Sequence, residues 1–449
     1  MIYKIGDFLI RSKDITIIND NECYQRVTVR MHHKGVVQRD KVLGSKIKTK
    51  RQYLVKSGQF IMSRIDARHG AFGIIPDDLD GAIITGDFLA FDIDTNKVNL
   101  EYFTDLTKST QFIQFCIDSS TGTTNRKRLK EELFLAFEIE VPNKEKQDKI
   151  INKINTFKVA YVNLETELKQ KEILVGQLKD SILRDAIQGK LVQQDENDEP
   201  AIVLLERIKE AKEQLIKEKK IKKEKPLPQI TDEEKPFDPP NGWEWVRLGD
   251  IIYSTDAGKS PKCIDESVEG DKWGVIKTTA IQKNDFIETQ NKVLPQNFAI
   301  SDSYVIKKGD VLITRAGPKN RVGIVCYVDE ITKNLILSDK TIRFSLPDNL
   351  IFNRYISLAL NSPLIRPFIE SKMTGMAESQ VNISQNNMRL FCIPLPPLVE
   401  QVRISEKINQ LMSLCDELEA NIEQSKIESE TLMKAVLQEA FMVKEEVLN

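Results

Sequence analysis

One helical pattern occurs twice in this chain, 254 residues apart, and this duplication constrains the fold more than any single motif. In the first copy the pattern comprises Ile150, Ile154, Phe157, Tyr161, Leu164, Leu168, Leu178 and Ile182. Its counterparts in the second copy are Ile404, Ile408, Leu411, Cys415, Leu418, Ile422, Leu432 and Val436. Because the spacing alternates between three and four residues, each copy is predicted to form the seam of a long coiled-coil helix.

The segments that precede the two helices also match, although more loosely. Residues 5–8 (IGDF) correspond to residues 248–251 (LGDI). The other aligned positions are Gly58, Ser63, Arg64, Gly73 and Gly122 in the first copy, and Gly309, Thr314, Arg315, Gly323 and Gly375 in the second. The loops between these positions differ. This contrast indicates two copies of one architecture that have diverged in what they contact.

We therefore predict a mixed α/β fold with an internal duplication and an approximate two-fold axis. Two globular modules are joined by two long antiparallel coiled-coil helices. The expected boundaries are 1–143 for the first module, 144–192 for the first long helix, 193–242 for a helical and polar linker, 243–396 for the second module, and 397–449 for the second long helix. The linker is expected to hold a helix at 201–223, followed by a proline-rich stretch.

Composition restricts the class of protein. The net charge is −2, yet residues 1–72 hold 15 Lys and Arg against 6 Asp and Glu, which is a local basic surface of the kind that binds phosphates. No apolar run is long enough to span a membrane, and the N-terminus lacks the features of a signal peptide. The six cysteines are scattered without a CxxC pair, so we expect reduced thiols in a cytoplasmic protein and no zinc site.

Motifs of catalysis are missing from the sequence. Neither a GxGxxG fingerprint nor a GxxxxGK[ST] loop is present, and three histidines leave little for a catalytic triad or a metal cluster. The segment 238–241 (DPPN) superficially resembles the catalytic loop of amino-methyltransferases, but it lies in the linker and no glycine-rich loop precedes it. We therefore predict no catalytic residue and no metal ligand.

Basic and small polar residues cluster in several loops, where they could approach phosphates and base edges. In the first module the candidates for DNA contact are Arg30, His32, Lys34, Lys46, Lys48, Lys50, Arg64, Arg68, His69, Thr124 and Asn125. In the second module they are Lys259, Lys262, Lys277, Thr278, Thr279, Arg315, Lys319, Asn320, Arg321 and Gln380. Any one of these residues could equally be an exposed surface charge, and a buried ion pair is the alternative role for Arg64 and Arg315.

Four segments carry a family resemblance that covers essentially the whole chain. They are 56–83 (KSGQFIMSRIDARHGAFGIIPDDLDGAI), 178–201 (LKDSILRDAIQGKLV with DENDEPA after it), 239–251 (PPNGWEWVRLGDI) and 393–408 (IPLPPLVEQVRISEKI). Together they resemble the specificity subunit of type I restriction–modification systems.

The resemblance implies a non-catalytic DNA-recognition subunit with two target-recognition domains, each reading one half of a split sequence. The helices would act as a ruler between them and dock two methyltransferase subunits, which motor-nuclease subunits join. S-adenosylmethionine, ATP and Mg²⁺ would bind to those partners. The sequence does not specify which bases are read, the spacer length or the oligomeric state of the isolated chain.

Two alternatives and one departure accompany this interpretation. The modules could bind protein instead of DNA, which would make the chain a coiled-coil scaffold, or the chain could be a fused enzyme, which the missing cofactor loops disfavour. The departure is the segment 140–150 (EVPNKEKQDKI), which replaces the proline-rich, Glu-Gln-containing start of the second long helix. We therefore expect the first long helix to begin differently from the second.

Overall fold

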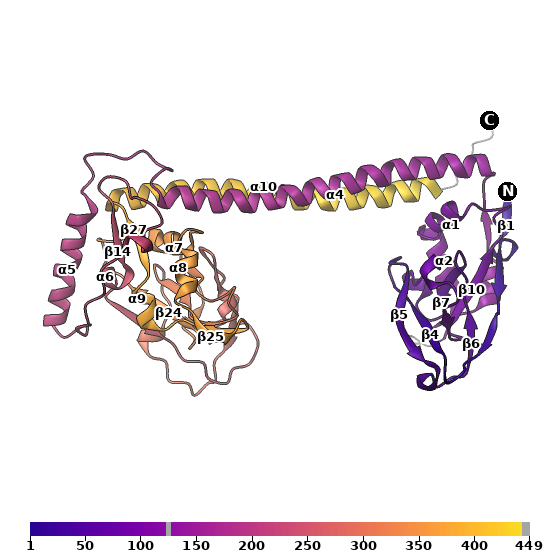
Figure 1. Ribbon diagram of the computed structural model, residues 1–449, viewed down its shortest axis with the longest axis horizontal. Coiled ribbons are helices and arrows are strands. Elements are labelled where there is room, and N and C mark those ends of the chain that lie inside the picture. The colour runs from indigo at the N-terminus through magenta and orange to yellow at the C-terminus, as the bar shows by residue number, and fades with distance from the viewer. Residues whose placement is uncertain (123–126, 442–449) are drawn as a thin grey trace. The chain divides into compact units, whose positions relative to one another are not determined.

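The computed structural model describes residues 1–122 and 127–441, and the chain divides into two compact units (Figure 1). The first unit comprises Met1–Gln170 and Ile422–Asn449, and the second comprises Lys171–Asn421. The two long helices are α4 (Lys144–Ile187) and α10 (Leu398–Phe441), and each contributes one end to each unit. In the described part of the chain, no helix has the length and apolarity that crossing a membrane requires.

The first module contains a four-stranded antiparallel sheet and a five-stranded mixed sheet. The first sheet has the order β2 (Leu9–Ser12), β10 (Phe88–Ile93), β7 (Phe60–Ser63), β8 (Phe72–Ile74). The second has the order β3 (Ile15–Ile17), β6 (Arg51–Leu54), β9 (Ile83–Ile84), β4 (Cys23–Val29), β5 (Val36–Leu43). The remaining elements are β1 (Ile2–Lys4) paired with β13 (Glu138–Glu140), β11 (Ser120–Thr121) paired with β12 (Arg128–Leu129), and the helices α1 (Leu100–Leu106), α2 (Thr110–Asp118) and α3 (Glu131–Leu135).

Aromatic side chains fill the core between the first sheet and the helices. The ring of Phe60 meets those of Phe103 and Phe112 edge to face, with centroids 5.0 and 6.2 Å apart. All three side chains are fully buried. Edge-to-face contacts of this kind add to the apolar area that each ring removes from water. These ring contacts pack α1 and α2 against the first sheet.

The second module contains a main four-stranded sheet and several smaller sheets. Its main sheet has the order β15 (Ser254–Ala257), β24 (Thr341–Ser345), β20 (Val311–Thr314), β22 (Val325–Tyr327). Smaller sheets are β19 (Asn291–Val293), β16 (Trp273–Ile276), β23 (Asn334–Ile336); β17 (Ile281–Gln282), β18 (Asp285–Phe286); β21 (Ala316–Gly317), β26 (Gln380–Asn382), β25 (Thr374–Ala377); and β14 (Glu244–Arg247) paired with β27 (Cys392–Leu395). Its helices are α6 (Leu248–Ile251), α7 (Asn353–Asn361), α8 (Arg366–Ser371) and α9 (Gln385–Arg389).

The main sheets of the two modules have the same strand order and the same antiparallel pairing. Arg64 and Arg315 occupy equivalent backbone positions in them. The amide of Arg64 donates to the carbonyl of Asp87 (2.8 Å), and the amide of Arg315 donates to the carbonyl of Lys340 (2.8 Å). The predicted duplication of a mixed α/β module followed by a long helix is confirmed.

One pair of glycines that the sequence aligns between the two modules is not equivalent in the structure. In the strand pairing, Gly73 lies opposite Ile61, and the residue in the same place of the second module is Cys326. The structural counterpart of Gly323 (φ +78°) is Gly70 (φ +72°), three residues earlier. Both glycines have left-handed backbone conformations, which side chains with a Cβ rarely adopt. The turn, not the strand, therefore retained its glycine.

A buried glutamine organises the start of the second long helix. Gln401 lies one turn into α10 and is fully buried. Its side chain accepts a hydrogen bond from the amide of Phe352 (2.9 Å) and donates to the carbonyl of Pro396 (3.0 Å). It thereby satisfies two backbone groups that would otherwise lie unpaired in an apolar environment.

The first long helix begins in the same way, so the expected difference between the two helix starts is wrong. Gln147, also fully buried, accepts from the amide of Asn99 (2.7 Å) and donates to the carbonyl of Pro142 (2.8 Å). Gln147 and Gln401 are 254 residues apart, the separation of the helical repeat. The segments around them differ in sequence, but the hydrogen-bonding role is the same.

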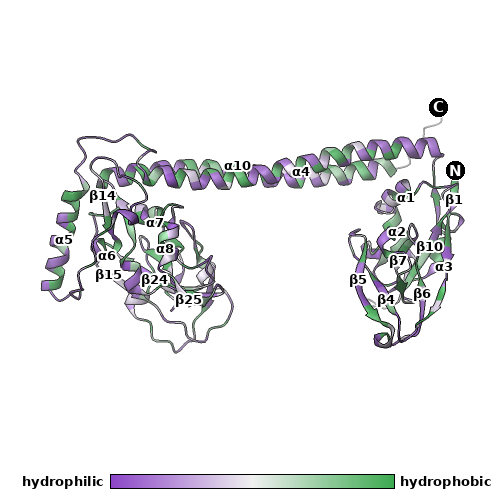
Figure 2. Ribbon diagram, in the orientation of Figure 1, coloured by the Kyte–Doolittle hydropathy of each residue, from purple (hydrophilic) through white to green (hydrophobic). Residues whose placement is uncertain are grey.

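The two long helices lie side by side and antiparallel, with apolar and hydrophilic residues interspersed along both (Figures 1 and 2). In the first unit, Lys153 of α4 forms an ion pair with Glu439 of α10 (3.7 Å). In the second unit, Lys179 of α4 pairs with Asp416 (2.8 Å) and Glu419 (2.9 Å) of α10. Each unit thus contains a segment of both long helices in contact with each other, as the duplication predicts.

The buried seam is narrower than predicted. The buried seam positions lie mostly seven residues apart and include two that the sequence analysis missed, Val175 and Ser429. Four predicted seam leucines are instead between 39% and 58% exposed: Leu164, Leu178, Leu418 and Leu432. A two-helix coil covers only one narrow stripe of each helix. Apolar residues beside that stripe therefore remain accessible.

The helix in the linker is shorter than expected. It is α5 (Ala201–Lys217), which ends before the lysine-rich run at 219–225. Lys219 has a left-handed backbone conformation (φ +57°), and a left-handed residue cannot continue an α-helix. The segment that follows folds back against the second module instead of extending α5.

Candidate nucleic-acid interface

Two loops of the first module are joined and bring five of the predicted residues together: Arg30, His32, Lys34, Arg68 and His69. The first loop is the turn between β4 and β5, and the second surrounds the short helix 67–69. The amide of His32 donates to the carbonyl of His69 (2.8 Å), and the amide of His33 donates to the carbonyl of Gly70 (3.1 Å). These backbone hydrogen bonds place the two loops side by side, and the five basic residues that the loops carry are here called the paired-loop surface.

The lysines of the next basic segment lie at the opposite end of the β4–β5 hairpin. β5 separates them from the paired-loop surface by eight residues, or roughly 26 Å at the rise of an extended strand. Lys50 forms an ion pair with Asp20 and donates to the carbonyl of Gly44 (2.9 Å). Lys46 and Lys48 are exposed. The first module therefore presents two separate basic surfaces.

Arg64 is engaged in an internal ion-pair network. Its guanidinium meets the carboxylate of Glu131 at 3.2 Å, and Arg11 meets the same carboxylate at 3.4 Å. The side chain of Arg64 is 30% exposed. This arrangement is the ion-pair alternative that the sequence analysis left open. The predicted Thr124 and Asn125 lie outside the described residues.

In the second module, two of the predicted residues line a cavity of about 370 Å³. Its lining includes Lys277 and Thr278, together with Ser260 and Lys340 from other loops. Lys277 forms an ion pair with Asp265 (2.8 Å), which leaves its ammonium partly neutralised. The flanking lysines are exposed, and one of them lies 5.8 Å from the centre of the Tyr304 ring. They are Lys259, which makes this ring contact, and Lys262.

A second group of predicted residues surrounds the strand β26. The amide of Lys319 donates to the carbonyl of Glu378 (2.8 Å), which brings the exposed Lys319 and Asn320 beside the exposed Gln380. Arg315 lies between this group and the cavity. Its side chain makes one long contact, from Nε to the amide oxygen of Asn382 (3.4 Å). Arg315 thus has a weaker internal partner than its counterpart Arg64.

Arg321 serves the fold of the loop that carries Thr278 and Thr279. Its guanidinium donates to the carbonyls of Thr278 (2.9 Å) and Ile281 (2.7 Å) and to the side chain of Gln282 (2.9 Å). Thr279 donates its hydroxyl to Gln290 (2.8 Å). The guanidinium donors of Arg321 are thus used within the module, whereas Thr279 is exposed and its hydroxyl oxygen can still accept a hydrogen bond.

Lys340 is an exposed cation that the sequence analysis missed. It borders the 370 Å³ cavity, and its carbonyl holds the amide of Arg315. Its counterpart in the first module is Asp87, which forms an ion pair with Arg128. Because the charge type is reversed between the two copies, only the three-dimensional equivalence identifies this position.

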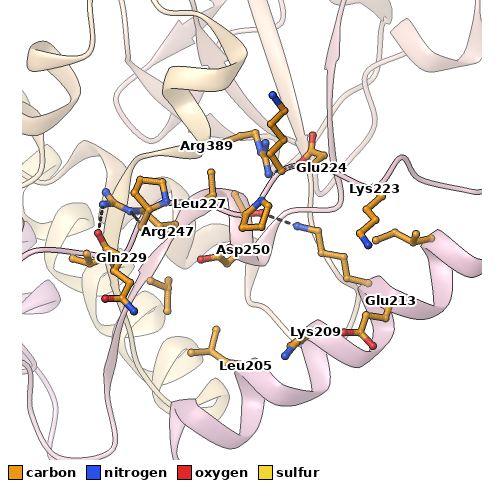
Figure 3. Close-up of a pocket in the computed structure, with 18 of the residues that line it drawn as sticks. Leu205, Lys209, Glu213, Lys223, Glu224, Leu227, Gln229, Arg247, Asp250 and Arg389 are labelled. Carbon is orange, nitrogen blue, oxygen red and sulfur yellow. Dashed lines mark hydrogen bonds and ion pairs between the residues drawn. The ribbon is translucent and has the colours of Figure 1, made fainter.

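A larger pocket, of about 640 Å³, lies in the second unit between α5 and the segment 222–230 (Figure 3). Lys212 reaches across to the carbonyl of Gly249 (2.6 Å), and desolvation lowers the pKa of its ammonium. Arg389 and Glu224 form an ion pair (2.6 Å) on another wall. The charged groups thus hold α5 and the returning segment onto the module, and basic side chains outnumber acidic ones in the lining of the pocket.

The described residues offer no evident metal centre, since no group of three His, Cys, Asp or Glu side chains among them could hold an ion. The thiols of Cys116 and Cys326 are buried, which raises their pKa far above the range of a reactive cysteine.

Comparison with known proteins identifies the second module and its helix. Residues 240–428 match the sequence model of the type I restriction modification DNA specificity domain. This stretch is similar to a type I DNA specificity domain. Its bounds take in the 370 Å³ cavity, Arg315 and the loops around β26.

Relatives of the whole specificity subunit extend the match. The chain is 38% identical over 371 residues to the EcoEI specificity subunit of Escherichia coli, a region that covers 73% of this chain and 62% of that protein. It is 35% identical over 263 residues to the EcoAI specificity subunit of the same species, covering 57% and 43%. The chain thus spans less than two thirds of these relatives. The predicted resemblance to type I specificity subunits is confirmed.

A solved structure shares the fold. Its subject is the complex assembly and conformational transition of the type I R-M system. The two chains match with a TM-score of 0.59 at 18% sequence identity. The match covers 98% of this chain and 97% of that one. Both modules and both long helices are therefore part of the shared architecture, including the first module that precedes the specificity-domain match.

Proposed function

We propose that this chain is the DNA-recognition subunit of a type I restriction–modification complex, in which each module reads one half of a bipartite duplex target. The observation that carries the proposal is the sheet order that the first module shares with the specificity domain of residues 240–428. Both modules carry cations and amides on exposed loops, which suits contact with phosphates and base edges. The loops differ between modules, as two different half-sites require.

The partners we propose are two methyltransferase subunits and, through them, motor-nuclease subunits. S-adenosylmethionine, ATP and Mg²⁺ would bind to those partners, and this chain would be non-catalytic. The support is the set of apolar side chains that the narrow seam leaves accessible, since exposed apolar patches mark sites of protein association. All six cysteines are free, which fits a reducing compartment such as the cytoplasm.

A gel-shift titration with the purified chain tests the proposal against a protein-binding scaffold. A duplex that contains the target, found by methylome sequencing of a host with the intact system, should be bound more tightly than a scrambled duplex. Affinity should fall at least tenfold between about 50 and 200 mM salt, because phosphate contacts release counterions. Absence of a shift, with or without the partner subunits, would leave the scaffold as the better description.

The equivalent arginines are expected to respond differently to truncation. Arg315→Ala should weaken DNA binding by about 1–3 kcal/mol if Arg315 contacts a base, and it should leave the melting temperature nearly unchanged, because its one internal contact is long. Arg64→Ala should lower stability by roughly 1 kcal/mol or more, because Glu131 then loses one of two cationic partners. Thermal melts and gel shifts on both variants separate these effects.

Insertion of seven residues into both long helices tests the proposed ruler. A matched heptad preserves the seam and adds about 10 Å, or roughly three base pairs. The preferred non-specific spacer should then lengthen while both half-sites stay the same, as a spacer library can show. An unchanged preference in a folded variant that still assembles would contradict the ruler.

A further inference from the structure

The turn that carries Arg30 and Lys34 has an unusual backbone. His32 (φ +59°) and His33 (φ +57°) are consecutive residues in the left-handed region, although both have a Cβ. Two consecutive left-handed residues form the centre of a type I′ hairpin turn, here closed by the amide of Lys34 on the carbonyl of Met31 (3.4 Å). Asn, Asp or Gly usually occupies these two positions, so a pair of histidines there is uncommon and carries a backbone cost that surrounding contacts must offset. Strained backbone of this kind concentrates at functional sites. The contacts that stabilise this turn therefore indicate its role.

Those contacts come from the second loop of the paired-loop surface. The amides of His32 and His33 donate to the carbonyls of His69 (2.8 Å) and Gly70 (3.1 Å). The imidazole of His33 packs edge to face on Phe72, with ring centroids 5.2 Å apart. A Cβ on Gly70 would lie 3.0 Å from the same imidazole. The ring therefore fits between Phe72 and a position that only glycine leaves open.

The ring of His33 behaves as an apolar spacer. Burial lowers the pKa of His33, and the nearby charges of Lys108 and His32 act in the same direction. Within the described residues, its Nδ1 atom is buried without a hydrogen-bond partner. The contacts that the structure shows for the ring are therefore packing contacts, with Phe72 and with the position of Gly70. Its packing is what connects the two loops.

The loops that it connects carry the exposed cations. Arg30, His32, Lys34 and His69 are exposed, and Arg68 is half-buried. Without the connection, each loop would have to be ordered when a ligand binds, which costs conformational entropy. A fixed spacing between the two loops is also what discrimination between base sequences needs, since contacts to base edges depend on geometry.

We propose that His33 is a positioning residue that fixes these two basic loops as one preformed DNA-reading surface of the first module. The proposal rests on the proposed function, and it assigns the specificity of one half-site to the geometry of this turn. His33 itself touches no base. It acts through the cations on either side of it.

Binding by the full chain tests the role in recognition. Three proteins are compared on the target duplex and on duplexes altered in one half-site: wild type, His33→Ala and His33→Phe. In His33→Ala, discrimination at the half-site read by the first module should fall roughly tenfold, and discrimination at the other half-site should not change. His33→Phe should restore most of the loss, because phenylalanine keeps the ring contact without an ionisable group. A folded His33→Ala protein with unaltered discrimination would overturn the proposal.

Amide hydrogen exchange tests the connection without DNA. The amides of His32 and His33 should be protected in wild type and in His33→Phe, and they should exchange much faster in His33→Ala, while the β7 amides stay protected. Slow exchange in His33→Ala would overturn the proposal, and so would equal loss of protection throughout the module, which would make His33 a general core residue. If the exchange pattern is as expected but none of the three proteins binds DNA, the proposed function is contradicted, whereas the role of His33 in connecting the two loops is supported.

A double-mutant cycle isolates the packing of the ring. Gly70→Ala is strained by its positive φ in any background, but only in the presence of His33 does the new methyl group also meet the imidazole. The loss of half-site discrimination caused by Gly70→Ala should therefore be smaller in the His33→Ala background than in wild type. Strictly additive effects would show that the ring does not transmit the contact.

Discussion

Exchange of residues 1–143 for the matching module of a relative is expected to replace one half of the recognised sequence and to leave the other half intact. The reason is that each module has its own sheets and core, while the starts of the two long helices share one hydrogen-bonding arrangement. Each mismatched base pair costs about 1–3 kcal/mol, so a changed half-site of a few base pairs should abolish recognition of the old target. Methylome sequencing of the chimaera together with its partner subunits measures the outcome.

The reciprocal exchange, of residues 243–396, provides the matched control. It should change the opposite half of the sequence and keep the spacer. Changes in both halves from a single exchange would show that the modules do not read independently. Loss of methylation with either chimaera, accompanied by failure to assemble, would instead indicate a damaged helix start.

The architecture was predictable because the duplication is carried by periodic apolar residues. A heptad pattern repeated after 254 residues specifies two similar helices, and short antiparallel strands follow from apolar runs between glycines. The seam was predicted too broadly, because Leu178 and Leu432 have the spacing of buried residues although no partner helix covers them. Periodicity identifies a face of a helix, but the number of helices that pack on that face decides how much of it is buried.

The candidate interface was predictable in composition and not in arrangement. In sequence, Arg64 and Arg321 resemble arginines that point into solvent. In the structure, Arg64 pairs with Glu131 and Arg321 donates to the carbonyl of Ile281, so both are engaged within their own module. The lysines at 46–50 lie near the paired-loop surface in sequence, but a strand of eight residues separates them in space. Such outcomes depend on contacts between residues distant in sequence, which local patterns do not encode.

The helix starts show how a shared role can be hidden by local sequence. Gln147 lies in a lysine-rich segment and Gln401 in a proline-rich one, and this contrast in sequence wrongly predicts a structural difference. Both segments meet the same requirement, because each helix start contains a part-buried backbone amide that needs an acceptor. The equivalence depends on one polar side chain in each helix, Gln147 or Gln401. The periodic pattern used for the prediction includes only apolar side chains.

Replacement of either glutamine with leucine should therefore destabilise the module that it serves by about 3–5 kcal/mol. Leucine has a similar size but no hydrogen-bonding group, and each backbone group left buried without a partner costs about 1–3 kcal/mol. Gln147 has three such partners, since it also donates to the carbonyl of Lys97 (3.0 Å). Gln410→Leu, at an exposed site on α10, is the matched control and should change stability by less than about 0.5 kcal/mol.

Tryptophan fluorescence can assign each loss to its module, because Trp243, Trp245 and Trp273 all belong to the second one. Gln401→Leu should lower the urea midpoint seen by fluorescence by about 1–2 M, at the slopes usual for domains of this size. Gln147→Leu should shift the far-ultraviolet circular dichroism transition and leave the fluorescence transition nearly in place. Near-normal midpoints in both variants would mean that water can hydrogen-bond to the backbone groups that lose their glutamine partner. The two helix starts would then be equivalent in geometry, but their glutamines would not contribute to stability.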